Sequence, residues 1–269
     1  MYEKYELWEP GHVPLYIEAF GGEAPYVETA LVETGKCNPV VIVVPGGAYV
    51  GVSKFNEGYP ICALLNAAGY SAVMLTYRVR PYGYPAQLVD LKRAIRFTRH
   101  HAKEWNIDPK KVGVIGFSAG AHLAMTGALA FDSPTPEAGD KSDRLSAKPD
   151  NAALCYGVCS LDPAITHAET RRVFLNGTDD EALERRFSGE NMVRSDAPPL
   201  FLWHTAEDKS VDPRNSLRLA EAFTAAGLPI TLHLFPHGWH GLGLAHEFPL
   251  ARDWGRLYTD WLDEVNRRK

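Results

Sequence analysis

Apolar residues along the chain fall into short continuous runs and into patterns with helical spacing. A continuous run is typical of a strand that is buried on both faces of a parallel sheet, and the β-branched stretch 40–44 is the clearest example. Residues 26–32 alternate weakly between apolar and polar, which is the pattern of an edge strand. Further runs predict buried strands at residues 71–77, 111–116, 152–156, 200–204 and 230–235.

Helical spacing follows most of these runs, at residues 59–68, 86–104, 119–130 and 213–226. Gly69 ends the first of these helices, and Gly227 ends the last. Asp212 and Pro213 provide the last helix with an N-cap and a proline in its first turn. A final apolar stripe, which we assign to the core rather than to a cofactor site, comprises Trp254, Leu257, Tyr258, Trp261, Leu262 and Val265.

Strands alternate with helices almost throughout, with no internal repeat and no change of composition. This order predicts a single α/β domain over residues 1–269, with a mostly parallel central sheet flanked by helices. Residues 1–35 form an N-terminal edge region in this prediction. We expect the polar stretch 132–150 to be a surface loop and the irregular stretch 160–199 to be a lid or a substrate wall.

Composition narrows the class of protein further. The chain of 269 residues is 45% apolar and 23% charged, as in ordinary globular proteins, and its net charge of −5 argues against nucleic-acid and anionic-membrane partners. The N-terminal residues show no signal-peptide pattern, and no apolar stretch reaches the roughly eighteen residues of a membrane span. Four cysteines are too few for a disulfide scaffold. We therefore predict a cytoplasmic protein with no membrane association.

A Gly-x-Ser-x-Gly motif, from Gly116 to Gly120, connects the predicted strand 111–116 to the predicted helix 119–130. In this context the central Ser118 would sit on a sharp turn with its hydroxyl exposed above the sheet, as a nucleophile does. The pentapeptide alone is a weak signal, and an ordinary strand-to-helix turn is the alternative. Partners elsewhere in the chain must decide between the two.

A serine nucleophile needs a neighbouring imidazole as base and a carboxylate that orients the imidazole. Ser118, Asp208 and His240 follow one another in the order found in α/β-hydrolases. Glu207 and Asp212 are alternatives to Asp208, but we assign Asp212 to the helix cap. Neighbouring loop residues usually point in different directions, so only one of Glu207 and Asp208 should face the site, and we favour Asp208.

The base is less well determined by spacing. His237 and His240 lie in the same glycine-bracketed loop after the last predicted strand, so spacing does not separate them. His122 lies one helical turn after Ser118, and we interpret it as a buried, hydrogen-bonded support. His204 and His233 lie within strands and are assigned to the core or the sheet surface. A metal site built from His237, His240 and His246 lacks a helix-borne ligand pair, so we expect no metal.

The loop after the first buried strand supplies the remaining candidate chemistry. Glycines in the stretch 45–48 allow backbone N–H groups to approach a ligand closely. We predict that the amides of Gly47, Ala48 and Ala119 form an oxyanion hole. Each of these loops follows the carboxyl end of a predicted strand, and so do the loops that hold Ser118, Asp208 and His240. Sheets of α/β proteins bind their ligands at this end.

Together these motifs resemble the α/β-hydrolase fold esterases of the acetyl-xylan-esterase and hormone-sensitive-lipase-like type. The resemblance covers about residues 38–265 and rests on four groups of residues: Gly116 to Ala124, Pro45 to Tyr49, Pro198 to Asp208 and His237 to Gly241, with Thr76-Tyr77-Arg78 beside them. In that family an x-x-Val step follows the acid, which implies Asp208, and the last histidine of the loop is the base, which implies His240. Lipase-like relatives have His-Gly-Gly-Gly where this chain has Pro45 and Ala48, a change that keeps the backbone donors.

The resemblance implies a serine carboxylesterase without a cofactor and with a small or absent cap. Its expected partner is a small ester with a short acyl chain, such as an acetylated sugar or xylo-oligosaccharide, and a homo-oligomer is compatible with it. Tyr49, Tyr82, Tyr84 and Trp239 would wall an open cleft, with ordinary packing as their alternative role. An amide or formamide hydrolase (an arylformamidase or small peptidase) and a non-catalytic binding module are the alternative functions.

Overall fold

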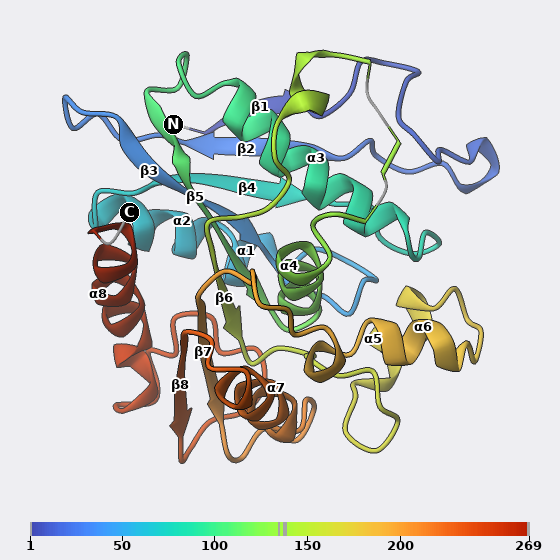
Figure 1. Ribbon diagram of the computed structural model, residues 1–269, viewed down its shortest axis with the longest axis vertical. Coiled ribbons are helices and arrows are strands. Elements are labelled where there is room, and N and C mark those ends of the chain that lie inside the picture. The colour runs from blue at the N-terminus through green and yellow to red at the C-terminus, as the bar shows by residue number, and fades with distance from the viewer. Residues whose placement is uncertain (1, 134, 137–138, 268–269) are drawn as a thin grey trace.

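The computed structural model describes residues 2–133, 135–136 and 139–267, and a twisted eight-stranded sheet runs through it (Figure 1). The strand order is β1-β2-β4-β3-β5-β6-β7-β8. The strands are β1 (Glu3–Glu6), β2 (Tyr26–Ala30), β3 (Asn38–Val44), β4 (Ser71–Thr76), β5 (Ile107–Phe117), β6 (Asn151–Cys155), β7 (Leu200–Thr205) and β8 (Ile230–Phe235). β1 and β2 pair antiparallel and β2 joins β4 antiparallel, whereas all other pairs are parallel. The predicted α/β class with a mostly parallel sheet is confirmed.

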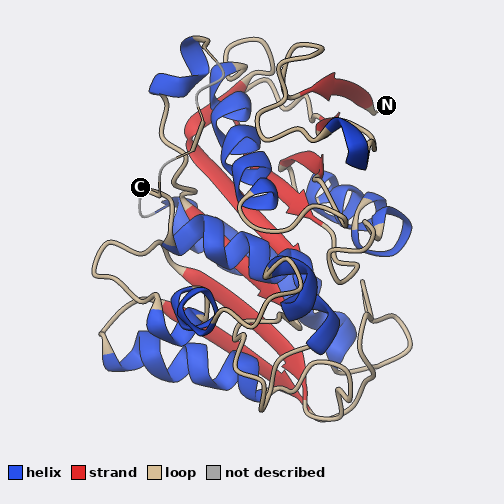
Figure 2. Ribbon diagram, turned by 90° about the vertical axis from the view of Figure 1, so that its right-hand side faces the viewer, coloured by secondary structure: helices blue, strands red, loops and turns tan. Residues whose placement is uncertain are grey.

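Helices cover both faces of the sheet, because strand side chains alternate between the two faces. Val41 and Val43 of β3 pack toward α2 (Tyr59–Ala67) and α8 (Trp254–Arg267). Ile42 and Val44 pack toward the opposite layer, which Figure 2 shows in front of the strands. That layer contains α3 (Ala86–His100), α4 (Ala119–Leu129) and α7 (Arg214–Ala225). The apolar stripe predicted near the C-terminus is the core-facing side of α8.

Several boundaries differ from the prediction. β1 was not predicted, because its polar sequence Glu-Lys-Tyr-Glu is largely exposed at the sheet edge and has no apolar periodicity. The predicted helix 86–104 ends earlier, at His100, and β5 begins earlier than predicted, at Ile107. α1 (Lys54–Glu57) is a single turn and was also missed. One turn is too short to show a helical period.

The stretch 160–199 is more regular than expected. It contains α5 (Ala168–Phe174), α6 (Glu181–Arg186) and the one-turn helix Gly189–Asn191, which lie together beside α7 (Figure 1). The backbone N–H groups of Thr170 and Leu183 bond to the side chains of His167 and Asp180, which cap the first two helices. The expectation that these segments are irregular was therefore wrong, whereas their role as a lid or a substrate wall stays a prediction. In the predicted loop 132–150, residues 134, 137 and 138 lie outside the described part, and Lys141–Arg144 form a one-turn helix.

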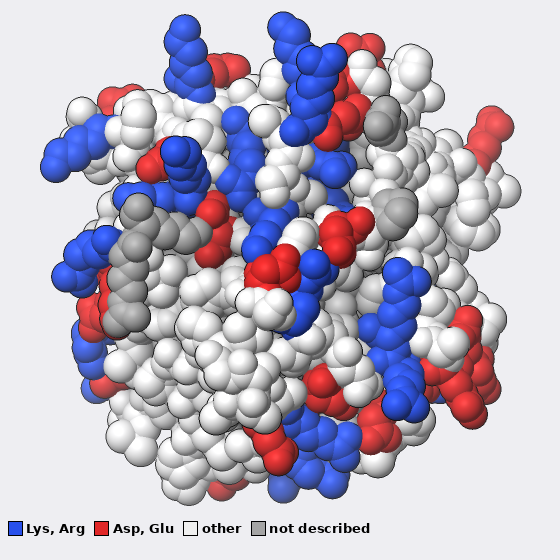
Figure 3. Space-filling model, viewed as in Figure 1, with Lys and Arg blue, Asp and Glu red and all other residues white. Residues whose placement is uncertain are grey.

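The surface carries charges of both signs in alternation on the face drawn in Figure 3. Lys and Arg side chains lie next to Asp and Glu side chains on this face. Arg194–Asp132 and Arg218–Asp162 are two of the surface ion pairs of the molecule. Among the residues that the structure describes, no helix is both long enough and apolar enough to cross a membrane.

Candidate active site

Ser118 lies at a sharp corner between β5 and α4. Its backbone has φ 52° and ψ −118°, a conformation that L-residues adopt rarely and that turns the side chain out of the sheet. A Cβ atom at Gly116 would collide with the backbone oxygen of Gly120, and a Cβ at Gly120 would collide with that of Val44. The glycines of the motif are therefore required by the close approach of β3, β5 and α4 around the serine.

Ser118, His240 and Asp208 form a continuous hydrogen-bonded chain. The Oγ atom of Ser118 lies 2.8 Å from Nε2 of His240, and Nδ1 of His240 lies 2.7 Å from Oδ2 of Asp208. The serine follows β5, the acid follows β7 and the histidine follows β8, all at strand carboxyl ends. In this arrangement the carboxylate fixes Nδ1–H of the imidazole and leaves Nε2 free to accept the serine proton.

The fold holds Asp208 in its ionised form. Its Oδ1 atom accepts hydrogen bonds from the backbone N–H groups of Ser210 and Val211, each at 2.9 Å. Nε2 of His204 lies 3.3 Å from the other carboxylate oxygen. Burial opposes the charge, but the hydrogen bonds from His204 and His240 outweigh burial and hold the pKa of Asp208 well below its usual range. Asp208 is therefore a permanent anion beside the imidazole.

His204, which the sequence assigned to the core or the sheet surface, lies in the core and also supports Asp208, a role that the sequence did not reveal. Its ring is fully buried, with Nδ1 2.8 Å from Oγ of Ser216 and Nε2 3.0 Å from the carbonyl oxygen of Val211. These contacts fix the ring, and Nε2–H lies between the carbonyl oxygen of Val211 and the carboxylate of Asp208. The residue lies inside the apolar run of β7, so only its position shortly before the acid could have drawn attention to it.

The alternatives to the acid and the base lie outside this chain of hydrogen bonds. Glu207 and His237 pair with each other at the surface, 3.0 Å apart, with side chains that are 55% and 69% exposed. Asp212 accepts the backbone N–H of Arg214 at the start of α7 and pairs with the Arg214 side chain. The predicted N-cap was wrong by one residue, since α7 begins at Arg214 with Pro213 as its N-cap, but Asp212 still lies at the helix start and outside the site.

His122 is buried beneath the serine turn, as expected of a support. Its Nδ1 lies 2.9 Å from the hydroxyl of Tyr49, and Nε2 lies 3.1 Å from the carbonyl oxygen of Phe187. Burial lowers the pKa of His122 to about 4, so the ring is neutral at physiological pH.

The loop after β3 packs directly against the serine. A Cβ atom at Gly46 would lie 2.9 Å from Cβ of Ser118, which shows how closely the two loops approach. Gly47 and Ala48 have positive φ values of 127° and 54°. Within the described residues, no protein acceptor takes the N–H group of Gly47, Ala48 or Ala119. These three amides are thus available to an oxygen bound beside Ser118.

The expected aromatic wall is only partly present. Tyr49 and Tyr82 are buried, at 0% and 7% exposure, so they pack inside the molecule and that part of the expectation was wrong. Tyr84 is half-buried and contacts the ring of Phe187. Trp239, which directly precedes His240, is 57% exposed, and its ring rests edge-on against Phe248. Trp239 is thus an exposed aromatic residue one position before the candidate base in the sequence.

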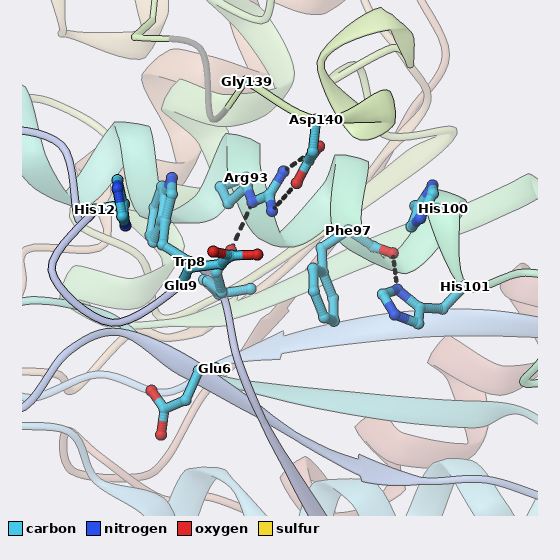
Figure 4. A pocket seen from close by; sticks show the side chains of 11 residues that line it. Glu6, Trp8, Glu9, His12, Arg93, Phe97, His100, His101, Gly139 and Asp140 are labelled. Atoms are coloured by element: carbon cyan, nitrogen blue, oxygen red, sulfur yellow. Dashed lines mark hydrogen bonds and ion pairs between the residues drawn. The ribbon is translucent and has the colours of Figure 1, made fainter.

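A separate cavity of about 500 Å³ lies between the N-terminal segment and α3 (Figure 4). Trp8, Arg93 and Phe97 line it, and Arg93 is paired with Asp140. His100 and His101, at the C-terminal end of α3, place it toward the amino ends of the strands, away from Ser118. Its lining offers no serine paired with a base, so we do not assign the chemistry to it.

Within the described part of the chain, no group of three or more His, Cys, Asp and Glu side chains is arranged to hold a metal ion.

Comparison with known proteins gives a consistent assignment. The family model BD-FAE matches residues 30–223. The chain is 35% identical over 215 residues to endo-1,4-β-xylanase B of Butyrivibrio fibrisolvens and 30% identical over 229 residues to acetylxylan esterase of Xylanibacter ruminicola. These matches cover 77% and 84% of this chain but only 33% and 45% of the two relatives, so the chain spans less than half of each.

A solved structure is similar over nearly its whole length. The acetyl ester-xyloside bifunctional hydrolase from Caldicellulosiruptor lactoaceticus is 41% identical, with a TM-score of 0.93 and coverage of 98% of this chain and 96% of that one. The carboxylesterase Cest-2923 from Lactobacillus plantarum is 28% identical, with a TM-score of 0.74 and coverage of 90% and 93%. The chain therefore belongs to the BD-FAE family of α/β-hydrolase fold esterases.

Proposed function

We propose that the protein is a serine carboxylesterase that removes short acyl groups, and acetyl groups from sugars or xylo-oligosaccharides in particular. The hydrogen-bonded chain from Ser118 through His240 to Asp208 carries this proposal. The names of the relatives support the substrate class, since they include an acetylxylan esterase and an acetyl ester-xyloside hydrolase. The exposed ring of Trp239 beside His240 offers a surface on which a sugar ring can stack.

The mechanism has two steps through an acyl-enzyme. Ser118 Oγ attacks the ester carbonyl while Nε2 of His240 takes its proton, and Asp208 stabilises the imidazolium that results. The amides of Gly47, Ala48 and Ala119 donate to the oxyanion of the tetrahedral intermediate. His240 then gives the proton to the departing alcohol, activates a water molecule and so releases the acid and the free serine.

Labelling with a fluorophosphonate probe tests the nucleophile. We expect modification at Ser118, found by peptide mapping, and its loss in Ser118→Ala, which should keep the wild-type circular dichroism spectrum. A series of p-nitrophenyl esters from acetate to octanoate should show turnover that falls beyond butyrate. A wild-type protein with neither label nor turnover would contradict the proposal and leave a non-catalytic binding role, whereas faster cleavage of formylated anilides than of esters would favour amide chemistry.

The sugar specificity has its own test at Trp239. We expect Trp239→Ala to raise KM for an acetylated xylo-oligosaccharide and to leave KM for ethyl acetate within about twofold, because only the sugar ester carries a ring that can stack on the indole. Tyr16→Ala is the matched control, since Tyr16 is 48% exposed on the N-terminal segment. Equal effects on both substrates would remove the stacking role. Acetate release from acetylated xylo-oligosaccharides is the measurement.

We also propose a reducing compartment, the cytoplasm, as the place of the reaction. All four cysteines are free thiols, and Cys62, Cys155 and Cys159 are buried. Localisation of a tagged protein by fractionation checks this.

A further inference from the structure

A second buried carboxylate lies behind the candidate site. Glu57, the last residue of α1, is only 3% exposed. Its Oε2 atom accepts the backbone N–H of Gly46, in the loop that packs against Ser118, at 2.8 Å. Its Oε1 atom accepts the hydroxyl of Tyr156 at 2.8 Å. Both oxygens therefore act as acceptors, as those of an ionised carboxylate do.

Tyr156 extends this contact to the loop that carries the base. Its hydroxyl oxygen accepts the backbone N–H of Gly243 at 3.0 Å, so its own proton is directed at Glu57. Its ring lies edge-on to the ring of His240, with 5.2 Å between centroids. The backbone of Tyr156 has φ 37°, an uncommon value for a side chain of this size. The tyrosine therefore joins the loop after β8 to Glu57 through one hydroxyl group.

We propose that Glu57 is a positioning residue for the esterase, because its two oxygens tie the oxyanion loop after β3 to the histidine loop after β8. The N–H group of Gly46 donates to Glu57, whereas those of Gly47 and Ala48 have no protein acceptor within the described residues. The bond through Tyr156 fixes the position of Gly243 and of the ring packed on His240. This inference rests on the proposed function, since the loops matter only if Ser118 is acylated.

Glu57 also brings a second negative charge to the histidine. His240, Tyr77, Tyr156 and Cys155 interact with it electrostatically, and His240 is the only one of them that gains a positive charge during the reaction. His167 and Asp208 face His240 from the other elements around it. Burial raises the pKa of Glu57, opposed by the hydrogen bonds from Tyr156 and Gly46. A carboxylate in this place attracts the positive charge that His240 gains when it takes the serine proton.

The test replaces Glu57 by its neutral isostere. We expect Glu57→Gln to lower kcat for p-nitrophenyl acetate by about 30- to 100-fold with KM within about threefold, since small misplacements of catalytic groups cost about that much. The acid limb of the kcat/KM–pH profile should move to lower pH, because a negative charge that favours imidazolium is lost. All rates are taken per active site titrated with the fluorophosphonate probe, so a loss of folded protein does not change them.

Two further variants separate the parts of the argument. Tyr156→Phe keeps the ring and the charge of Glu57 but breaks the bridge to Gly243, so kcat should fall about tenfold with the acid limb unmoved. In the double variant Glu57→Gln/Tyr156→Phe, kcat should fall by the same factor as in Glu57→Gln alone, because the two residues act in one network. Tyr156→Phe also tests the proposal if Glu57→Gln does not fold. Glu28→Gln is the control: this half-buried carboxylate contacts Lys54 at the other end of α1, and we expect kcat within twofold of wild type.

An active wild type together with a Glu57→Gln variant that keeps kcat within twofold and the same pH profile would overturn the positioning role and leave the esterase assignment intact. If the losses in kcat of the two single variants added up in the double variant, Glu57 and Tyr156 would not act through one connection between the loops. A wild type without turnover would overturn the proposed function, and the role of Glu57 would fall with it.

Discussion

Two carboxylate–histidine pairs join the same two loops of this molecule, and only one of them is built into the candidate site. Asp208 and His240 are 2.7 Å apart, with side chains that are 0% and 20% exposed. Glu207 and His237, in the same loops, are 3.0 Å apart and 55% and 69% exposed. Residue type and spacing along the chain are nearly the same for both pairs. Their surroundings differ.

The difference lies in what surrounds each carboxylate. Asp208 receives two backbone N–H groups and the ring of His204, and its histidine reaches Ser118. Glu207 receives the backbone N–H of Gly238 at 3.3 Å and the ring of His237, and its side chain is 55% exposed. Water screens an exposed ion pair, so that the pair contributes little free energy. Around the buried Asp208 there is less screening, and each fixed dipole interacts more strongly with the carboxylate. A triad is therefore recognised by its supporting contacts and by burial, rather than by the pairing of an acid with a histidine.

Removing each histidine gives the largest expected contrast between the two pairs. We expect His240→Ala to lower kcat for p-nitrophenyl acetate by about 10⁵- to 10⁶-fold, because the serine loses its base. His237→Ala should stay within about twofold of wild type. Steady-state kinetics per mole of protein, with circular dichroism to check that each variant is folded, measures both. If His237→Ala were the inactive variant, the exposed pair would be the functional one.

Removing each carboxylate charge should give a somewhat smaller contrast. Asp208→Asn keeps the shape of the side chain but favours the wrong tautomer of His240, so we expect kcat to fall by about 10⁴-fold. Glu207→Gln should leave kcat and the unfolding midpoint unchanged within error, because the pair is exposed to solvent. The same assay and a thermal unfolding scan provide the measurements. Comparable losses in the two variants would show that burial does not separate the pairs.

The two pairs also show how far the sequence alone reaches. The buried strands and the turn at Ser118 were predictable, since continuous apolar runs and the Gly-x-Ser-x-Gly motif have local causes. The roles of Ser118, Asp208 and His240 stay predictions, although the structure brings their side chains together. Spacing could not separate His237 from His240, because both lie in one loop and only tertiary packing buries one of them.

For a related reason, the pattern of apolar residues could not identify the supporting residues His204 and Glu57. His204 lies inside the apolar run of β7, and Glu57 lies on a single helical turn with no periodicity of its own. Their partners are far away along the chain, as in the bond from Tyr156 to Glu57. Contacts of this kind depend on the completed fold, whereas a motif search detects only neighbours in sequence. The short helices α5 and α6 escaped prediction because each has fewer than two full turns.

His122 is a buried histidine that has no carboxylate partner among the described residues. Its effect on the stability of the protein can therefore be compared with that of the paired histidines. His122 has its pKa lowered to about 4 by burial, below the value of about 6.5 in the unfolded chain. The unfolded state therefore binds more protons between these values, and the contribution of His122 is present above pH 6.5 and lost as pH falls toward 4. This loss amounts to about 3 kcal/mol.

Urea unfolding at pH 7.5 and at pH 4.5 measures this loss. We expect His122→Gln to be less stable than wild type at pH 7.5 but to lose less stability on acidification. His237→Gln, at the exposed histidine, should keep the wild-type difference between the two pH values. A His122→Gln variant with the same pH dependence as wild type would show that this buried ring does not titrate on unfolding.

The smallest expected effect comes from removing His204, one of the groups that support the Asp208–His240 pair. Asp208 would then have fewer supporting contacts, as Glu207 does. His204→Phe removes the N–H group that lies 3.3 Å from Asp208, and we expect kcat to fall about tenfold with KM nearly unchanged. Because His204 helps to hold the pKa of Asp208 down, activity should also be lost at a higher pH on acidification than in wild type. His204→Gln, which keeps an N–H donor, should recover part of both effects. If His204→Phe and His204→Gln behaved alike in the pH profile, the ring would be a packing residue, and the backbone donors of Ser210 and Val211 alone would set the charge of the acid.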